Sequence, residues 1–314
     1  MSAYVVNNGY FHGAMLLVGR ILMLSALAFG LLQCESEIEL DFNDFQPKLV
    51  INAQISADSG FVVVIGASTT PINPEPGDVP ADLVVTLIDL GTDEPIEMYR
   101  ENDQFLTGPT VTVKPGANYL IEASAPGYEP VQAITTVPEN VEVEQVLVEN
   151  FNIVESEVTP DKKNVSYSLS FEFKNNDASY LHFIFTQHTT ITSGGVNPTE
   201  ELSYRLSPEF PEESGYVKHV DDGILVSIHE LESYPIRFKF NDYTIDAVDE
   251  VLGELEVEVR TVSPEYYWYF VSLSRQLETL KDPFAEPVPV FTNVDGGLGN
   301  FSGYSSKTIT LILE

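Results

Sequence analysis

The stretch KPGANYLIEASAPGYEPVQAITTV, residues 114–137, shows most clearly the pattern from which the fold class of this chain can be predicted. Two strand-like runs, 119–123 and 131–137, each follow a segment that contains a Pro-Gly pair. Proline fixes φ and lacks a backbone donor, and glycine accepts positive φ, so each pair marks a turn. The stretch therefore predicts two short antiparallel strands that are preceded and joined by turns.

Similar runs extend this pattern toward the N-terminus. Further strands are expected at 49–55, 61–65, 83–88, 96–99 and 111–113, and the proline-rich segment 71–77 interrupts them. About seven short runs at a spacing of roughly 8–15 residues are typical of a small antiparallel sandwich. We therefore expect an immunoglobulin-like β-sandwich over residues 48–138, with the domain boundary at Pro138-Glu139-Asn140.

Residues 139–314 are expected to form a second β-rich domain. Strands are predicted at 141–148, 166–173, 180–185, 224–228, 237–240, 255–262 and 307–313, with a long irregular excursion at 193–222. The first of these runs opens with alternating apolar and charged residues, which is the period of a half-buried strand. The predicted fold class is therefore mainly β, with two β-sandwich-like domains.

One amphipathic helix is predicted in the second domain, over residues 264–281. Ser263 can cap its N-terminus, Pro264 suits the first helical position, and Glu265 favours the positive end of the helix dipole. Apolar residues recur every three or four positions, namely Tyr266, Phe270, Leu273, Leu277 and Leu280. Asp282-Pro283 ends the helix. We expect the apolar stripe to pack on the domain.

Five consecutive aromatic residues, 266–270, stand on this helix and include the chain's single tryptophan. A helix turns by 100° per residue, so these five side chains cannot all face one core. Tyr267 or Trp268 is therefore expected to project away from the apolar stripe, where it either packs between domains or contacts a partner. Because Tyr and Trp offer large contact areas with a polar edge, Tyr267 and Trp268 are the candidate platform for a partner or glycan.

Charge and composition limit the classes of protein to which the chain can belong. Its 314 residues include 15 Lys and Arg against 48 Asp and Glu, which gives a formal net charge of -33. Such a chain is repelled by nucleic acid phosphates and by anionic membrane surfaces, so neither is an expected partner. A single cysteine excludes an intrachain disulfide, a thiolate zinc site and an iron–sulfur cluster.

The first 33 residues are expected to be a lipoprotein signal peptide. Arg20 is followed by the apolar or small residues 21–32, which as a helix would span about 18 Å, too short for a bilayer core of roughly 30 Å. A positive residue, a short apolar run and a switch to acidic chain are the layout of a secretory signal. Leu31-Leu32-Gln33-Cys34 resembles a lipobox, which makes Cys34 the predicted lipid attachment site. The alternative is a retained membrane anchor with an incidental cysteine. The leader is long, so Met15 is a second candidate initiator besides Met1.

Residues 34–47 are predicted to form an acidic tether. No Asp or Glu precedes Glu35, and the segment ESEIELDFND, 35–44, is strongly acidic. An acidic run directly after a lipidated cysteine resembles the surface-export signal of Bacteroidota lipoproteins. The alternative is a solvated tether that only avoids phospholipid. Multiple acyl chains anchor a protein stably, so we expect an outer-membrane location that faces the cell surface.

Both ends of the expected mature chain resemble one family. The segment PKLVINA, 47–53, follows the lipobox and acidic run, while DPFAEPV, 282–288, and NVDGGLGNF, 293–301, follow the aromatic helix. Together these segments resemble a Bacteroidota family catalogued as domain of unknown function 4249. The resemblance implies a surface accessory role, because members of that family are often encoded beside TonB-dependent outer-membrane receptors.

The two matched segments after the helix are expected to have structural roles. Prolines hold the first segment extended, and Phe284 and Val288 are expected to bury there as anchors. Gly296, Gly297 and Gly299 are expected to form a tight turn before the last strand. A dinucleotide-binding loop is rejected because the glycine spacing misses by one residue and the segment runs toward a strand.

Histidines and carboxylates are the remaining candidates for chemistry. They are His182, His188, His219 and His229 and the acidic pairs Glu212-Glu213, Asp221-Asp222 and Asp249-Glu250. His182 and His188 would lie about 20 Å apart on an extended segment, too far to share a metal. No HExxH, G-x-S-x-G or EF-hand pattern occurs. We predict no catalytic, cofactor-binding or metal-binding residues, and expect the acidic pairs to form a solvated face or a weak divalent-cation site.

The expected function is therefore non-enzymatic. We expect a lipid-anchored surface protein that assists a TonB-dependent transporter in ligand capture or uptake. One alternative is a structural or adhesive envelope protein that uses its sandwich as a spacer. The other is a carbohydrate-active hydrolase whose two carboxylates come from separated loops.

Overall fold

The computed structural model describes residues 46–313, apart from 58–59, 68–78, 103, 109–110, 175–179, 193–198, 210–216, 229–234, 247–248 and 283. The predicted signal peptide, Cys34 and most of the predicted tether lie outside these residues, as do Glu212-Glu213 and His229. The described chain is mainly β, as predicted, and its one described helix is α2 (Pro264–Thr279).

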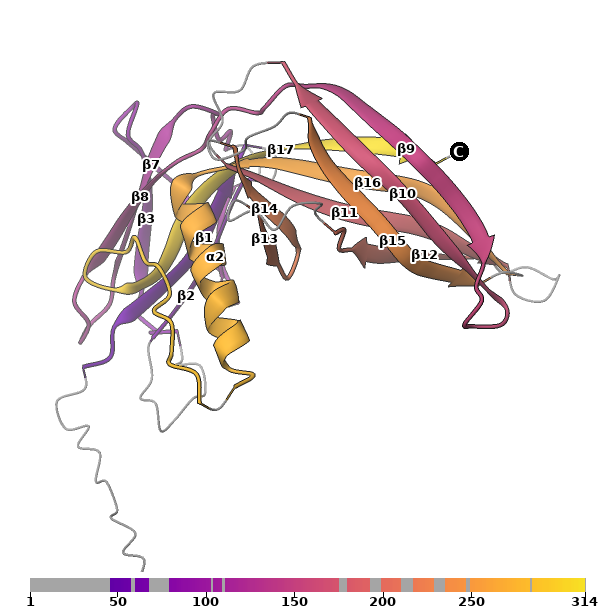
Figure 1. Ribbon diagram of the computed structural model, residues 1–314. Helices are drawn as coiled ribbons and strands as arrows, with labels where there is room; N and C mark the ends of the chain where they lie inside the picture. The colour runs from indigo at the N-terminus through magenta and orange to yellow at the C-terminus, as the bar shows by residue number, and fades with distance from the viewer. Residues whose placement is uncertain are drawn as a thin grey trace, which may run out of the picture. The chain divides into compact units, whose positions relative to one another are not determined.

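The strands share three sheets (Figure 1). In chain order they are β1 (Leu49–Ser56), β2 (Gly60–Ala67), β3 (Val84–Asp89), β4 (Glu94–Ile96), β5 (Met98–Glu101), β6 (Gln104–Thr107), β7 (Asn118–Ser124), β8 (Val131–Thr136), β9 (Val143–Glu155), β10 (Lys162–Phe173), β11 (Tyr180–Thr192), β12 (Thr199–Leu206), β13 (Val217–Val220), β14 (Gly223–Ser227), β15 (Ile236–Asp246), β16 (Glu250–Val262) and β17 (Leu298–Ile312).

Strands β1 to β8 build an immunoglobulin-like sandwich. One layer has the strand order β1-β2-β6-β5 and the other has the order β4-β3-β7-β8. Lettered in chain order, these layers are A-B-E-D and C′-C-F-G, which is the immunoglobulin arrangement with an added strand beside C. Alternate residues of both layers bury in one core, among them Leu49, Ile51, Leu87, Tyr119 and Ile121. The number and spacing of the short strand-like runs therefore predicted this part of the fold correctly.

The later strands also form two layers around a core. The order β13-β14-β11-β16-β17 makes one layer, with β12 on β11, and β15-β10-β9 makes the other. Aromatic rings fill the space between them. Ring centroids lie 4.7 Å apart for Phe183 and Phe238, 5.2 Å for Phe171 and Phe183, and 5.1 Å for Phe185 and Phe240. Such contacts stabilise a core beyond the burial of area alone.

Strand β17 belongs to both cores. Its first half, Leu298 to Tyr304, pairs in parallel with β1, and its second half pairs antiparallel with β16. Phe301 is fully buried in the first core. Gly296 has positive φ and precedes the strand, as predicted, whereas Gly299, with φ of 98°, lies inside the strand. A Cβ at Gly299 would stand 2.1 Å from the carbonyl oxygen of Ile51, so glycine is needed for the approach of β1.

Helix α2 begins as the sequence predicts. Ser263 is the N-cap and its hydroxyl accepts a hydrogen bond from the Tyr266 N–H at 3.3 Å. The helix ends two residues before the predicted end, with Leu280 as its C-cap. The predicted apolar stripe is buried only near the N-terminus, because Leu277 is 39% exposed and Leu280 is 70% exposed.

Hydrogen bonds, and not the burial of apolar side chains, hold the second half of α2 in place. The Ser272 hydroxyl accepts from the Phe291 N–H at 2.8 Å, and Gln276 Oε1 accepts from the Val288 N–H at 2.7 Å. The chain that returns after the helix is therefore fixed through its backbone. Phe284, expected to be a buried anchor, is 94% exposed, so that prediction is wrong.

Two strand predictions also differ from the structure. Residues 111–113 form no strand, although Val113 is buried in the first core, and β6 lies earlier, at Gln104–Thr107. A run of three residues can bury one side chain without pairing with a neighbouring strand. The excursion expected at 193–222 contains β12 and β13, which pair with β11 and β14.

Candidate functional site beside helix α2

The aromatic run on α2 divides between the interior and the surface. Tyr267 is 3% exposed and stacks on Tyr180 with ring centroids 4.3 Å apart, so it offers a partner little surface. Trp268 is 45% exposed and meets Tyr267 edge-on at 5.2 Å. Of the two residues in the predicted platform, Trp268 is therefore the one that a partner can reach. Its use as a platform stays a prediction.

Replacing Trp268 with alanine is expected to lower the free energy of unfolding by about 1 kcal/mol, because its edge contacts with two tyrosines are lost. Thermal unfolding measures this loss. The control is Phe284→Ala, which removes a 94% exposed ring and should leave the melting temperature unchanged. If Trp268→Ala lowers the melting temperature but the variant still co-purifies with the same partner, the platform hypothesis is wrong.

A cavity of about 190 Å³ lies between α2 and the turn that joins β13 to β14. Its lining includes His182, Asp221, Asp222, Phe270, Leu273 and Leu277. The helix supplies the apolar wall, and the turn supplies two exposed carboxylates. His182 comes from β11 and is 2% exposed. Figure 1 shows α2 beside β13 and β14, where this cavity lies.

Hydrogen bonds fix the orientation of the His182 ring. Its Nδ1 lies 3.0 Å from the Tyr266 hydroxyl, which also accepts from Arg260 Nη1 at 3.3 Å. Arg260 is itself held by two bonds to Glu258, at 2.6 and 3.1 Å, and its guanidinium lies 4.7 Å from the centroid of the Tyr304 ring. A line of contacts thus runs from a paired arginine through Tyr266 to the imidazole.

Burial controls the protonation of this group of residues. Desolvation lowers the pKa of His182 to about 3, and the positive charges of Arg260 and Arg205 lower it further in the same direction. Desolvation raises the pKa of Tyr266 to about 12, although Arg260 acts against this rise. Burial is the largest single influence on Arg260 and lowers its pKa, but the hydrogen bond to Glu258 and the interactions with Tyr266, Glu258 and Tyr304 together outweigh it, so the net pKa is raised. At neutral pH the imidazole and the phenol are therefore uncharged.

A second cavity, of about 340 Å³, lies between α2 and the neighbouring strands β1 and β17. It shares Phe270 and Leu273 with the first cavity. Asn300 lines it and is 3% exposed, and its Oδ1 has no hydrogen-bond partner among the described residues. At the rim, the Tyr269 hydroxyl donates to Asn52 Oδ1 at 3.3 Å. Two cavities thus flank the same helix.

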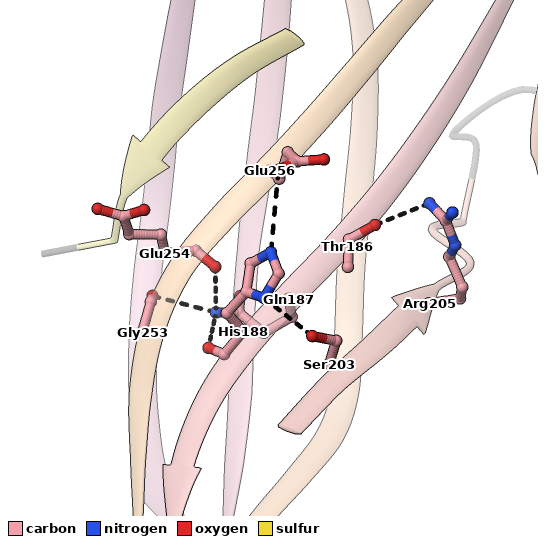
Figure 2. A network of polar contacts seen from close by, with 8 residues as sticks. All are labelled: Thr186, Gln187, His188, Ser203, Arg205, Gly253, Glu254 and Glu256. Atoms are coloured by element: carbon pink, nitrogen blue, oxygen red, sulfur yellow. Dashed lines mark hydrogen bonds and ion pairs between the residues drawn. The ribbon is translucent and has the colours of Figure 1, made fainter. Parts of the chain in front are cut away.

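Another polar network lies on β11 and contains residues that line neither cavity (Figure 2). Gln187 is fully buried, and its Nε2 donates to the carbonyl oxygens of His188, Gly253 and Glu254 at 2.9, 3.1 and 3.2 Å. The register between β11 and β16 shifts between Gln187 and Thr189. The amide therefore satisfies backbone acceptors that a β-bulge leaves unpaired, which is a structural role.

Figure 2 also shows Ser203, His188 and Glu256, the residue types of a nucleophilic triad. The Ser203 hydroxyl lies 2.9 Å from His188 Nδ1, but Glu256 Oε2 lies 4.0 Å from His188 Nε2, beyond hydrogen-bond range. The imidazole and the carboxylate are 43% and 46% exposed. We assign Ser203, His188 and Glu256 no catalytic role. Among the described residues, no group of three or more His, Cys, Asp and Glu side chains is placed to hold a metal ion.

Comparison with known families identifies the chain. The family model described as a domain of unknown function, DUF4249, matches residues 35–310. The chain belongs to the DUF4249 family. The match starts at the residue after Cys34 and includes every described strand up to most of β17. No curated protein matches this DUF4249 chain.

Only some of the residues beside α2 in this DUF4249 protein could be predicted from the sequence. It singled out the aromatic helix and named His182 and Asp221-Asp222, but it did not bring them together. His182 stands on a strand whose neighbouring positions are apolar, and that isolation is the local sign that its ring is buried with a polar partner. The partner Tyr266 is 84 residues later, so no local spacing connects the two. Of the described helices, none is both long and apolar enough for a membrane span.

Proposed function

We propose that this DUF4249 protein is a lipid-anchored outer-membrane protein that faces the cell surface. It assists a TonB-dependent transporter in the capture or uptake of a ligand, and it does so without catalysis. The observation that carries the proposal is the lone cysteine, Cys34, at the junction between an apolar leader and an acidic chain. The family match begins immediately after it, which fits a mature chain that starts there.

Charge and fold support this location and role. A net charge of -33 keeps the folded chain away from anionic phospholipid, so a covalent lipid, and not a basic patch, has to supply membrane affinity. Two sandwiches that share one sheet through β17 make a stable support for surface sites. The cavities beside α2 support ligand capture, because each combines apolar side chains of the helix with polar side chains of the neighbouring strands or turn.

Intact-mass measurement tests the anchor. Protein extracted from membranes is expected to begin at Cys34 and to carry acyl chains, whereas Cys34→Ala should retain residues 1–33 and carry no acyl mass. Gln33 occupies a position that a small residue usually takes in a lipobox, so Gln33→Gly is the matched variant and should be processed at least as fully. A wild-type protein with a free Cys34 thiol and an attached leader would refute the anchor.

Co-purification tests the transporter role separately. After mild solubilisation, the acylated protein is expected to recover a β-barrel receptor of the TonB-dependent class, and Cys34→Ala is expected to lose it. Recovery of the acylated protein without any such receptor in several detergents would remove the transporter role while leaving the anchor intact.

A further inference from the structure

Four large apolar side chains are exposed to solvent around the C-terminal end of helix α2. Leu277 lies in the last turn, Leu280 is the C-cap, and Phe284 follows the helix. Leu298 opens β17, two positions before Asn300, which lines the cavity beside α2, so both side chains project from the same face of the strand. The four exposed fractions, in chain order, are 39, 70, 94 and 41%. Exposed apolar side chains gathered in one place mark a contact surface, here called the apolar end.

Helix α2 runs antiparallel to β1. Ser263, at the N-terminus of the helix, is hydrogen-bonded to Gly303, which pairs with Ile55 near the end of β1. Further along the helix, the Tyr269 hydroxyl donates to Asn52 Oδ1 in the middle of β1. The helix therefore proceeds from the end of β1 toward its start.

The apolar end lies at the end of the body from which the chain leads to Cys34. From Tyr269 to Leu280 the helix rises about 17 Å, and from Asn52 back to Gln46 the chain covers at most about 20 Å. In Figure 1 the C-terminal end of α2 and the start of β1 both lie toward the bottom of the view. A lipid attached at Cys34 would therefore be on the side of the body that exposes these apolar residues.

The charges around the apolar end nearly cancel. Residues 270–290 contain two cations and three carboxylates, all exposed, namely Arg275, Lys281, Glu278, Asp282 and Glu286. This stretch has a net charge of -1, whereas the whole chain has -33. Asp221 and Asp222 border Leu277 across the first cavity, so Leu277 lies at the rim of the surface and Leu280 and Phe284 lie at its centre. A nearly uncharged apolar surface on an acidic protein suits zwitterionic lipid, since anionic surfaces repel the rest of the chain.

We propose that the apolar end rests on the lipid surface to which Cys34 anchors the chain. Leu280 and Phe284 enter the boundary between headgroups and acyl chains, and the charged neighbours remain among the headgroups. Gln46 follows Cys34 by twelve positions, which span at most about 43 Å. A tether of this length holds the apolar end near the lipid at an effective concentration on the order of millimolar, so a few side chains suffice. The contact rests on the proposed anchor, and it adds a fixed orientation of the body on the membrane.

Brominated phospholipids quench tryptophan on contact and test the proposal directly. Acylated protein extracted from membranes is reconstituted in phosphatidylcholine vesicles, with Phe284→Trp as the probe in a Trp268→Phe background. Bromines near the headgroup end of the acyl chains are expected to lower the emission of this probe about twofold. Val158→Trp in the same background is the control, because Val158 is 90% exposed on the turn between β9 and β10. Its emission should not change.

Flotation of the vesicles separates this contact from the anchor. Protein that floats with the vesicles and is quenched only at position 284 supports both. Protein that floats without quenching at 284, or with equal quenching at 158, would overturn the contact and leave the anchor intact. Protein that does not float would refute the anchor, and the contact with it.

A second substitution tests the surface without moving the probe. Leu280→Ser, at a 70% exposed position, is expected to reduce the quenching of Phe284→Trp by about half and to leave the melting temperature unchanged. Ile312→Ser is the matched control, since Ile312 is 68% exposed at the end of β17, and it should change neither quantity. Equal quenching in the two variants would show that Leu280 does not touch lipid and would overturn the proposed surface.

Discussion

Replacing Gly299 with alanine is expected to lower the free energy of unfolding by about 3 kcal/mol or more. The Cβ of the new residue would lie 2.1 Å from the Ile51 carbonyl oxygen and 2.8 Å from its carbonyl carbon. Both atoms belong to the backbone of β1, which pairs with β17 at this position, so a side-chain movement cannot relieve the contact. The φ of 98° adds a second cost, because residues with a Cβ disfavour it. Urea unfolding at neutral pH measures the combined loss of stability from the steric contact and the backbone conformation.

Two matched glycines separate these contributions. Gly127 has a φ of 85° and open space where a Cβ would be, so Gly127→Ala should lose only the backbone term, about 1 kcal/mol. At Gly108 a Cβ also meets nothing within 4 Å and φ is not in the positive range, so Gly108→Ala should change stability by less than about 0.5 kcal/mol. If Gly299→Ala costs no more than Gly127→Ala, the close approach of β1 and β17 is wrong.

Acidification is expected to destabilise the protein through His182. Burial and the charges of Arg260 and Arg205 lower its folded-state pKa to about 3, while the unfolded value is about 6.5. The unfolded state therefore binds the proton first. The contribution of His182 is fully present above about pH 6.5 and is lost as the pH falls toward 3, by at most about 1.4 kcal/mol per pH unit.

A comparison with His182→Gln isolates this contribution from that of the carboxylates. Urea unfolding from pH 8 to pH 4 should give a steeper loss of stability for the wild type than for the variant, and the difference in slope should approach one proton. Tyr266 and Asp222 also face this region, but both are present in the wild type and in the variant, so the difference between the two proteins reports His182. Parallel curves would show that His182 titrates near its ordinary pKa in the folded state.

Local chemistry accounts for the features that sequence reasoning predicted correctly. The Ser263-Pro264-Glu265 sequence fixes where α2 begins, because a capping hydroxyl, a proline and an acid each satisfy one requirement of a helix N-terminus. The alternation in β7 and β8 likewise follows from a strand with one buried face.

Features that depend on distant parts of the chain could not be predicted in this way. Tyr267 is buried because Tyr180 stacks on it, and residues 87 positions apart in sequence give no local sign of that contact. His182 likewise acquires its environment from α2 and from the β13–β14 turn. The exposure of Phe284 depends on how the returning chain is bonded to Ser272 and Gln276, which hydrophobicity alone does not indicate.

The double membership of β17 has a consequence for the order in which the chain folds. Phe301 completes a core whose other residues come mostly from the first half of the chain, and its strand partner is β1, some 250 residues earlier. A chain that is synthesised N-terminus first therefore cannot complete its leading sandwich until its last strand has been made. Contacts of such long sequence separation slow folding, so the leading half would spend the interval with an unfilled interior that favours aggregation.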